Sequence, residues 1–86
     1  HRELEPILSL KQNKKDEFLK TLYTFLGNGG NLQQTMQDLN LSMSGLVYRI
    51  QKIEELLNRN LRDSKNSFEL ILLLESLIVL GEIEVE

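Results

Sequence analysis

Hydroxyl, amide and methyl-bearing side chains follow one another between residues 42 and 51, where the apolar spacing is that of a helix. Hydroxyls hydrogen-bond to several bases, a glutamine amide bonds bidentately to adenine, and a methionine or valine methyl contacts the thymine methyl group. The amino-terminal part of a recognition helix carries such residues into the major groove of DNA. The predicted base-reading residues are Ser42, Met43, Ser44, Val47, Tyr48 and Gln51.

Four other side chains are better suited to the phosphate groups of DNA than to its bases. Arg49 and Lys52 are cations on the same predicted helix. Gln33 and Gln34 stand at the start of the preceding predicted helix, where free backbone N–H groups near Leu32 favour an anion. We predict that these four residues fix the orientation of the protein on DNA.

Simpler interpretations compete with these roles. Tyr48 can pack against a neighbouring side chain, as partly exposed aromatic residues often do. Arg49 can pair with Asp38 or Glu54 at the surface, and such a pair contributes only about 0–1 kcal/mol. The two glutamines can be ordinary solvated helix residues.

Residues 31–57 are predicted to hold two helices joined by a tight turn. Leu32, Met36 and Leu39 are spaced four and three apart, so they share one face of a first helix that Asn31 caps. The turn is predicted at residues 40–42, where an asparagine can adopt the left-handed conformation and a serine can cap the second helix.

The second helix has one clear apolar face, formed by Leu46, Ile50, Ile53 and Leu57. Two short amphipathic helices around a tight turn are the arrangement of a helix-turn-helix, with residues 31–57 as its core.

The rest of the chain is predicted to complete an all-α bundle of four to five helices. A short helix is expected within residues 3–10 and a polar connector at 11–15. A long helix then begins at Asp16 and Glu17 and buries Phe18, Leu19, Leu22, Phe25 and Leu26. A last helix, from about residue 64 to 80, is apolar nearly all round and is expected to be buried on more than one side. Residues 81–86 are interpreted as a short strand or a frayed tail.

Composition argues against several classes of function. The 86 residues include no cysteine, and their one histidine stands at position 1. No paired carboxylates are expected at a pocket, so we predict no catalytic site, no metal and no cofactor. The apolar run in the last predicted helix is shorter than the roughly 20 residues of a membrane span. The net charge of −3 does not favour nucleic acid, although six of the thirteen acidic residues lie after residue 62.

The sequence also resembles a known family. The segments LYTFLGNGGNLQQT, LNLS, GLVYRIQKIEELL and LRDSKNSFELILLLESL are similar to the carboxy-terminal domain of PucR/CdaR-type bacterial transcription regulators, whose helix-turn-helix is Fis-like. The resemblance implies a cytoplasmic DNA-binding domain that follows a larger sensor domain. The chain, which does not begin with methionine, is accordingly expected to be a single-domain fragment of a longer regulator.

The sequence departs from the family pattern at the start of the second helix. Many members carry His-Arg-Asn-Thr where this chain has Ser42-Met43-Ser44-Gly45, and an arginine where it has Val47. A small residue of the first helix is replaced by Met36. Two basic contacts that the family pattern implies are therefore absent.

Two functional hypotheses follow. In the first, the chain binds double-stranded DNA sequence-specifically. Part of its last helix is then expected to meet a partner, which is either a second copy, giving a homodimer, or the sensor domain. In the second, it is a helical interaction or dimerisation module without DNA affinity.

Overall fold

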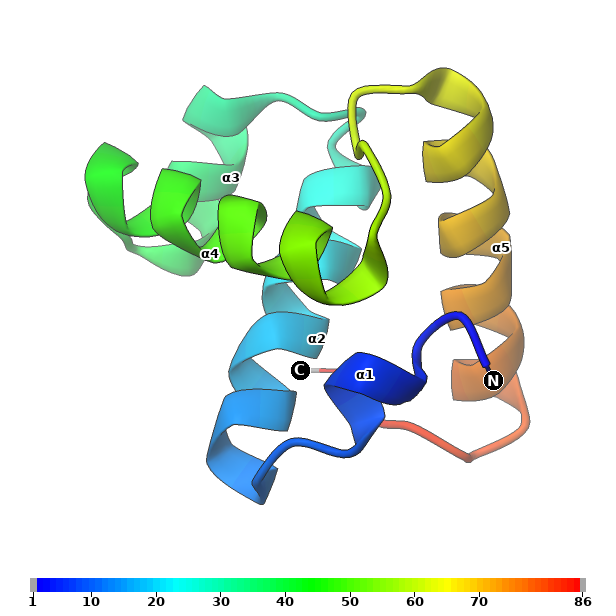
Figure 1. Cartoon of the computed structure of the whole chain (residues 1–86). Helices are drawn as coiled ribbons and strands as arrows, with labels where there is room; N and C mark the ends of the chain where they lie inside the picture. Colours follow the sequence, from blue (N-terminus) through cyan, green and yellow to red (C-terminus); the bar gives the residue numbers. More distant parts are fainter. Residues whose placement is uncertain (1, 86) are drawn as a thin grey trace.

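The computed structural model describes residues 2–85 and shows five α-helices. The all-α fold is therefore confirmed. In chain order (Figure 1) the helices are α1 (Glu5–Leu8), α2 (Gln12–Gly27), α3 (Leu32–Leu39), α4 (Met43–Leu57) and α5 (Ser64–Val79).

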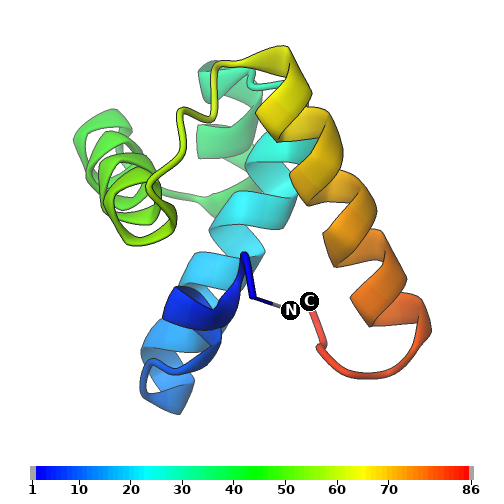
Figure 2. The ribbon, with the colours of Figure 1, turned by 45° about the vertical axis from the view of Figure 1, so that its right-hand side comes forward.

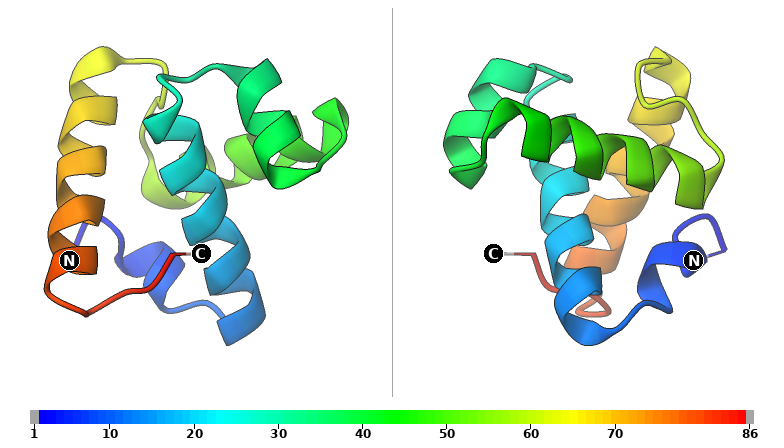
Figure 3. Two further views of the ribbon diagram at one scale, coloured as in Figure 1. Left: turned by 180° about the vertical axis from the view of Figure 1, so that it is seen from behind. Right: turned by 60° about the vertical axis from the view of Figure 1, so that its left-hand side comes forward.

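Helix α2 lies at the centre of the bundle. It packs against each of the other four helices, whereas α5 contacts α2 alone among the helices. Figure 2 shows α2 between the α3–α4 pair on one side and α5 on the other. Figure 3 shows α4 crossing α2, with α1 beside both. The helix-turn-helix and α5 are thus two separate structures built on one central helix.

The core draws on every helix except α3 and on three positions outside the helices. Its buried apolar residues are Leu4, Ile7, Phe18, Leu19, Leu22, Phe25, Leu26, Leu46, Ile50, Ile53, Leu57, Leu61, Leu70, Leu74, Leu77 and Ile83. The predicted apolar faces of α2 and α4 are confirmed. On α3, Leu32, Met36 and Leu39 are half-buried and pack against this core, while the fully buried residue is Thr35.

Three predictions require correction, and the first concerns the start of α2. The helix begins at Gln12, so most of the predicted connector is helical and Asp16 and Glu17 lie beyond the first turn. Residues one helical turn apart stabilise this extension: Gln12 donates to the Asp16 carboxylate at 2.9 Å, and Lys14 lies 3.7 Å from Glu17.

The second and third corrections concern the carboxy-terminal end. Helix α5 buries only Leu70, Leu74 and Leu77, because α2 covers one side of it. After Gly81, which has a positive φ of 75°, the tail turns back beside the first half of α2 (Figure 3). It buries Ile83 there and forms no strand within residues 81–85, so it is neither a strand nor a frayed end.

Candidate nucleic-acid interface

The α3–α4 turn has the geometry that its sequence predicts. Asn31 caps α3 by accepting a hydrogen bond from the Gln34 amide at 2.9 Å. Asn40 is left-handed, with φ 54° and ψ 48°, and the Leu41 amide bonds back to the Met36 carbonyl at 3.0 Å. Ser42 Oγ then accepts from the Gly45 amide at 3.1 Å and starts α4. These bonds fix α4 relative to α3.

The predicted base-reading residues share one side of the first turns of α4. The side chains of Ser42, Ser44 and Gln51 are exposed, Met43 is 37 % exposed and Tyr48 is 57 % exposed. Val47 is half-buried at the edge of this surface. The structure therefore leaves five of the six side chains open to solvent at the start and along the first half of α4, with Val47 at the margin.

The two predicted phosphate-binding cations of α4 are engaged within the protein. Arg49 Nη1 donates to Thr21 Oγ1 at 3.2 Å, and Nη2 lies 4.0 Å from Glu17 of α2. Lys52 Nζ is 3.6 Å from Glu55 and 5.9 Å from the centre of the Tyr48 ring. The competing interpretation, in which Arg49 pairs within the protein, thus agrees with the structure, but the partners lie on α2 and are not Asp38 or Glu54.

The two glutamines lie in the first turn of α3, and one belongs to a polar network. Gln34 Nε2 donates to Asp38 Oδ1 at 2.8 Å, while Gln33 is exposed. Asn28 joins the end of α2 to this network, donating to Asp38 Oδ2 at 3.0 Å and to Thr35 Oγ1 at 3.1 Å. The hydrogen bonds from Asn28 and Gln34 lower the pKa of the Asp38 carboxyl, since they stabilise its charged form. The network positions α3 against α2.

A groove of about 1040 Å³ runs along the side of α4 that bears Val47 and Gln51. The floor lies at the end of α2, and the far wall is the segment between α4 and α5. We call it the α4 groove. It is lined by Phe25, Leu26, Gly29, Gly30, Leu32, Val47, Ile50, Gln51, Glu54, Asn58, Arg59, Asn60, Leu61, Arg62, Ser64 and Ser67.

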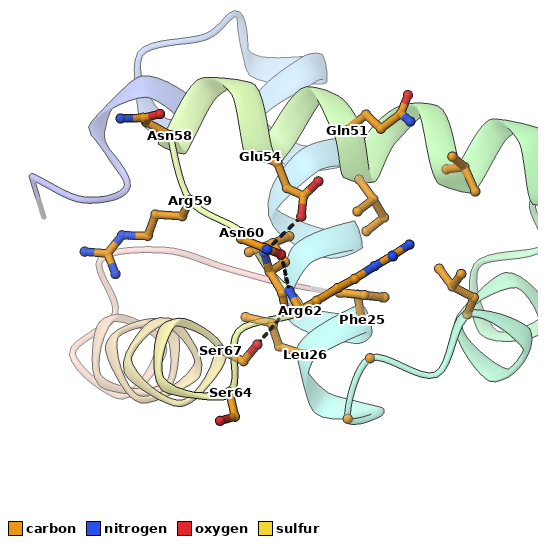
Figure 4. Close-up of a pocket in the computed structure, with 16 residues that line it drawn as sticks. Phe25, Leu26, Gln51, Glu54, Asn58, Arg59, Asn60, Arg62, Ser64 and Ser67 are labelled. Carbon is orange, nitrogen blue, oxygen red and sulfur yellow. Dashed lines mark hydrogen bonds between the residues drawn. The ribbon is translucent and has the colours of Figure 1, made fainter.

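Arg62 is a groove residue to which the sequence analysis assigned no role. Its side chain extends across the α4 groove in Figure 4, whereas the Arg59 side chain points away from it. Arg59 instead binds Glu3 at 3.4 Å, Glu69 at 3.3 Å and Asn66 at 3.0 Å. No local pattern in the sequence separates these two arginines, because the difference depends on the path of the loop between α4 and α5.

Helix α5 presents a second surface of different chemistry. Phe68, Leu72 and Val79 are 62 %, 50 % and 83 % exposed. Among these residues, between Leu72 and Val79, stands the exposed Glu75, whose carboxylate accepts a hydrogen bond from the Tyr23 hydroxyl of α2. That bond to a carboxylate raises the pKa of Tyr23, because ionising the hydroxyl would break the bond and place two negative charges together.

No group of three or more His, Cys, Asp or Glu side chains that could hold a metal ion occurs within residues 2–85. Over the same residues, no helix is both long and apolar enough to span a membrane.

A capped α3, a three-residue turn and a longer α4 with a polar outer side define a helix-turn-helix domain. The family model of the PucR C-terminal helix-turn-helix domain matches residues 18–76, and the chain belongs to this family. No curated protein and no solved structure matches the chain.

Proposed function

We propose that this chain is the sequence-specific DNA-binding domain of a bacterial transcription regulator that acts in the cytoplasm. The observation that carries the proposal is the exposed row of hydroxyl, amide and methyl groups on the first turns of α4, in a domain of the PucR helix-turn-helix family. In the longer regulator, a sensor domain precedes the chain. The domain itself has no catalytic role.

Base reading is assigned to Ser42, Met43, Ser44, Val47, Tyr48 and Gln51. Gln51 can bond bidentately to adenine, and a pair of that kind contributes about 1–3 kcal/mol of discrimination against the wrong base. Phosphate contacts are assigned to Gln33, Gln34, Arg49 and Lys52. Because Arg49 and Lys52 already have partners, they must exchange or share these partners on DNA, and we expect binding to be weak for one copy.

The first experiment is a selection of DNA duplexes from a random pool at low salt, followed by anisotropy titrations of the enriched duplex and a scrambled one. Gln51→Ala and Tyr48→Ala should reduce discrimination between the two duplexes. Asn13→Ala removes an exposed amide from the first turn of α2 and should leave discrimination unchanged. If the pool enriches no sequence, the interaction-module hypothesis replaces this one.

We further propose that two copies associate through the exposed apolar side of α5. The two cations of α4 itself, Arg49 and Lys52, already have partners, so a single copy has little to hold it on DNA at cellular salt. Two copies would read half-sites roughly 34 Å apart and combine their contacts. In an antiparallel pair of α5 helices, Lys65 near one end of each helix would approach the acidic tail of the other, around Glu84.

Leu72→Glu tests the pairing, because it places a charge at the middle of the exposed apolar side of α5. We expect sedimentation equilibrium to give a dimer for the unmodified chain and a folded monomer for this variant, with weaker DNA binding. Asn13→Glu adds the same charge on α2 and should remain dimeric. A monomer at high concentration of the unmodified chain would disprove pairing through α5.

A further inference from the structure

The four basic residues between positions 31 and 62 differ in what surrounds them. Arg49 is held by α2, Lys52 by Glu55 and Tyr48, and Arg59 by Glu3, Glu69 and Asn66. Arg62 is exposed, and within residues 2–85 its side chain forms neither an ion pair nor a hydrogen bond with the protein. It is therefore the cation of this region that can accept an anion without breaking an existing contact.

The backbone that carries Arg62 is fixed by hydrogen bonds at the preceding residue and at its own amide. The Leu61 amide donates to Glu54 Oε2 at 2.9 Å, and Ser67 Oγ donates to the Leu61 carbonyl at 2.6 Å. The Arg62 amide itself donates to Asn60 Oδ1 at 2.9 Å. Leu61 is only 2 % exposed and anchors this loop in the core. The loop therefore holds the start of the Arg62 side chain at a set position beside α4.

The same groove links Arg62 to the predicted base-reading surface. Val47 and Gln51 line its α4 side, and Figure 4 shows Arg62 extending from the opposite side across the groove, beneath α4. A phosphate bound to Arg62 would lie beside the helix turn that carries Gln51. This is the relation expected of the DNA backbone next to a base that Gln51 reads, because phosphate contacts fix the register in which bases are read.

We propose that the α4 groove seats one strand of the DNA backbone and that Arg62 is its phosphate contact. A guanidinium matches a phosphate group bidentately, which makes arginine well suited to this role. The inference rests on the proposed DNA-binding function and adds to it a contact outside the two helices of the helix-turn-helix.

The chemistry of the groove favours a polymer backbone over a small anion. The groove is open and offers one unpaired cation, and the Glu54 carboxylate lies in the same wall as Gln51. That carboxylate, which accepts a hydrogen bond from the Leu61 amide, would repel an anion from its own side of the groove, so we expect the phosphate beside the Arg62 guanidinium. A strand held there also by base contacts of α4 needs only one cation from the groove.

Arg62→Gln tests this contact by removing its charge, and Lys20→Gln removes one charge from an exposed position on α2. Each phosphate contact contributes about 0.9 to the slope of log K against log[salt]. Arg62→Gln should therefore flatten the slope by about 0.9 and weaken binding to the enriched duplex about 8-fold at 0.1 M salt, with little difference near 1 M. Lys20→Gln should match the unmodified chain, and Arg62→Lys should keep the slope.

The experiment distinguishes failure of the DNA-binding function from failure of the Arg62 contact alone. If the unmodified chain enriches no duplex, both the DNA-binding function and this contact are wrong. If it binds, and Gln51→Ala loses discrimination while Arg62→Gln keeps the original slope, only the contact is wrong. Circular dichroism and thermal unfolding of each variant exclude loss of fold as the cause of weaker binding.

A second readout locates the contact directly. Because the chain has no cysteine, Arg62→Cys provides a single thiol for attachment of a DNA-cleaving iron chelate. We expect cuts at one or two positions in the backbone flanking the bases protected by α4, and none from the same label on Lys20→Cys. Equal cutting by both labels, or cutting spread along the duplex, would overturn the proposal.

Discussion

Helices α4 and α5 are nearly equal in length but face the solvent with opposite chemistry. Helix α4 buries Leu46, Ile50, Ile53 and Leu57 and turns a mainly polar side outward. Helix α5 buries three leucines and leaves Phe68, Leu72 and Val79 exposed. A polar outer side suits a surface that meets water or DNA, whereas an exposed apolar row suits a protein partner. The comparison assigns the two proposed partners of the domain, DNA and a second copy, to different helices.

The largest expected effect separates the buried row of α4 from the exposed row of α5. Leu46 is fully buried, so Leu46→Ala should lower the free energy of unfolding by about 2–5 kcal/mol, through lost transfer energy and an unfilled cavity. Leu72→Ala removes the same atoms from a half-exposed position and should cost far less. Urea denaturation at low protein concentration, where pairing is excluded, provides the measurement. Equal losses for the two variants would contradict the assigned burial.

Burial was predictable for α4 and not for α5, for a physical reason. In α4 apolar and polar positions alternate with the helical period, so the inner side follows from the sequence. In α5 every position from 70 to 74 is apolar, and the sequence cannot say which side meets α2. The caps were predictable because Asn31, Ser42 and Asp63 act on amides two or three residues away.

The candidate interface was likewise only partly predictable from the sequence. The exposed side of α4 followed from its periodicity, but the partners of Arg49 did not, since Thr21 and Glu17 lie about thirty residues earlier in the chain. The orientation of Arg62 likewise depends on a loop whose path is set by Glu54 and Ser67. Interactions between residues distant in sequence therefore account for what the sequence analysis missed.

Replacing the amino-terminal caps of α4 and α5 should have an effect of intermediate size on stability. Asp63 accepts from the Lys65 amide at 2.9 Å and from the Asn66 amide at 3.2 Å, and its charge also interacts favourably with the helix dipole. Ser42 accepts from one backbone amide, that of Gly45. Replacing either residue by alanine should cost about 0.5–2 kcal/mol, with the larger loss for Asp63→Ala. Chemical denaturation would show a reversed order if the α4 cap were the stronger one.

A smaller effect is expected where α4 contacts α2. Arg49→Met removes the hydrogen bond to Thr21 while keeping much of the aliphatic chain, and should cost about 0.5–1.5 kcal/mol. Thr21 still donates to the Glu17 carbonyl at 2.8 Å, which limits the loss. Lys52→Met removes a surface ion pair with Glu55 and the cation contact with the Tyr48 ring, and should change stability less. If Arg49→Met leaves stability unchanged but flattens the salt slope of DNA binding, Arg49 acts as a phosphate contact rather than as a brace to α2.

The bond that joins α5 to α2 should weaken at high pH. The pKa of Tyr23 is raised above its ordinary value of 10.0 in the folded chain. Between pH 10 and the higher pKa of the folded chain, the unfolded state has therefore lost a proton that the folded state keeps. Its contribution to stability is complete below pH 10 and disappears as pH rises through the folded pKa. The difference in stability between the unmodified chain and Tyr23→Phe should therefore shrink over this alkaline range, as followed by urea denaturation. A constant difference would show that the hydroxyl does not titrate with folding.

The hydrogen-bond network around Asp38 in the helix-turn-helix should weaken at low pH. Asn28 and Gln34 lower the pKa of Asp38 below 3.8, so in acid the unfolded state binds a proton before the folded state does. The contribution is complete above pH 3.8 and is lost as pH falls through the folded pKa. The Asp38→Asn side chain keeps an oxygen that accepts a hydrogen bond, but it cannot titrate. The stability of this variant should therefore fall less steeply in acid than that of the unmodified chain. The effect should be small because Asp38 is exposed, and NMR titration of its carboxyl gives the direct check. If α3 and α5 resonances shift together in acid, rather than those of α3 alone, the two sides of α2 do not respond separately.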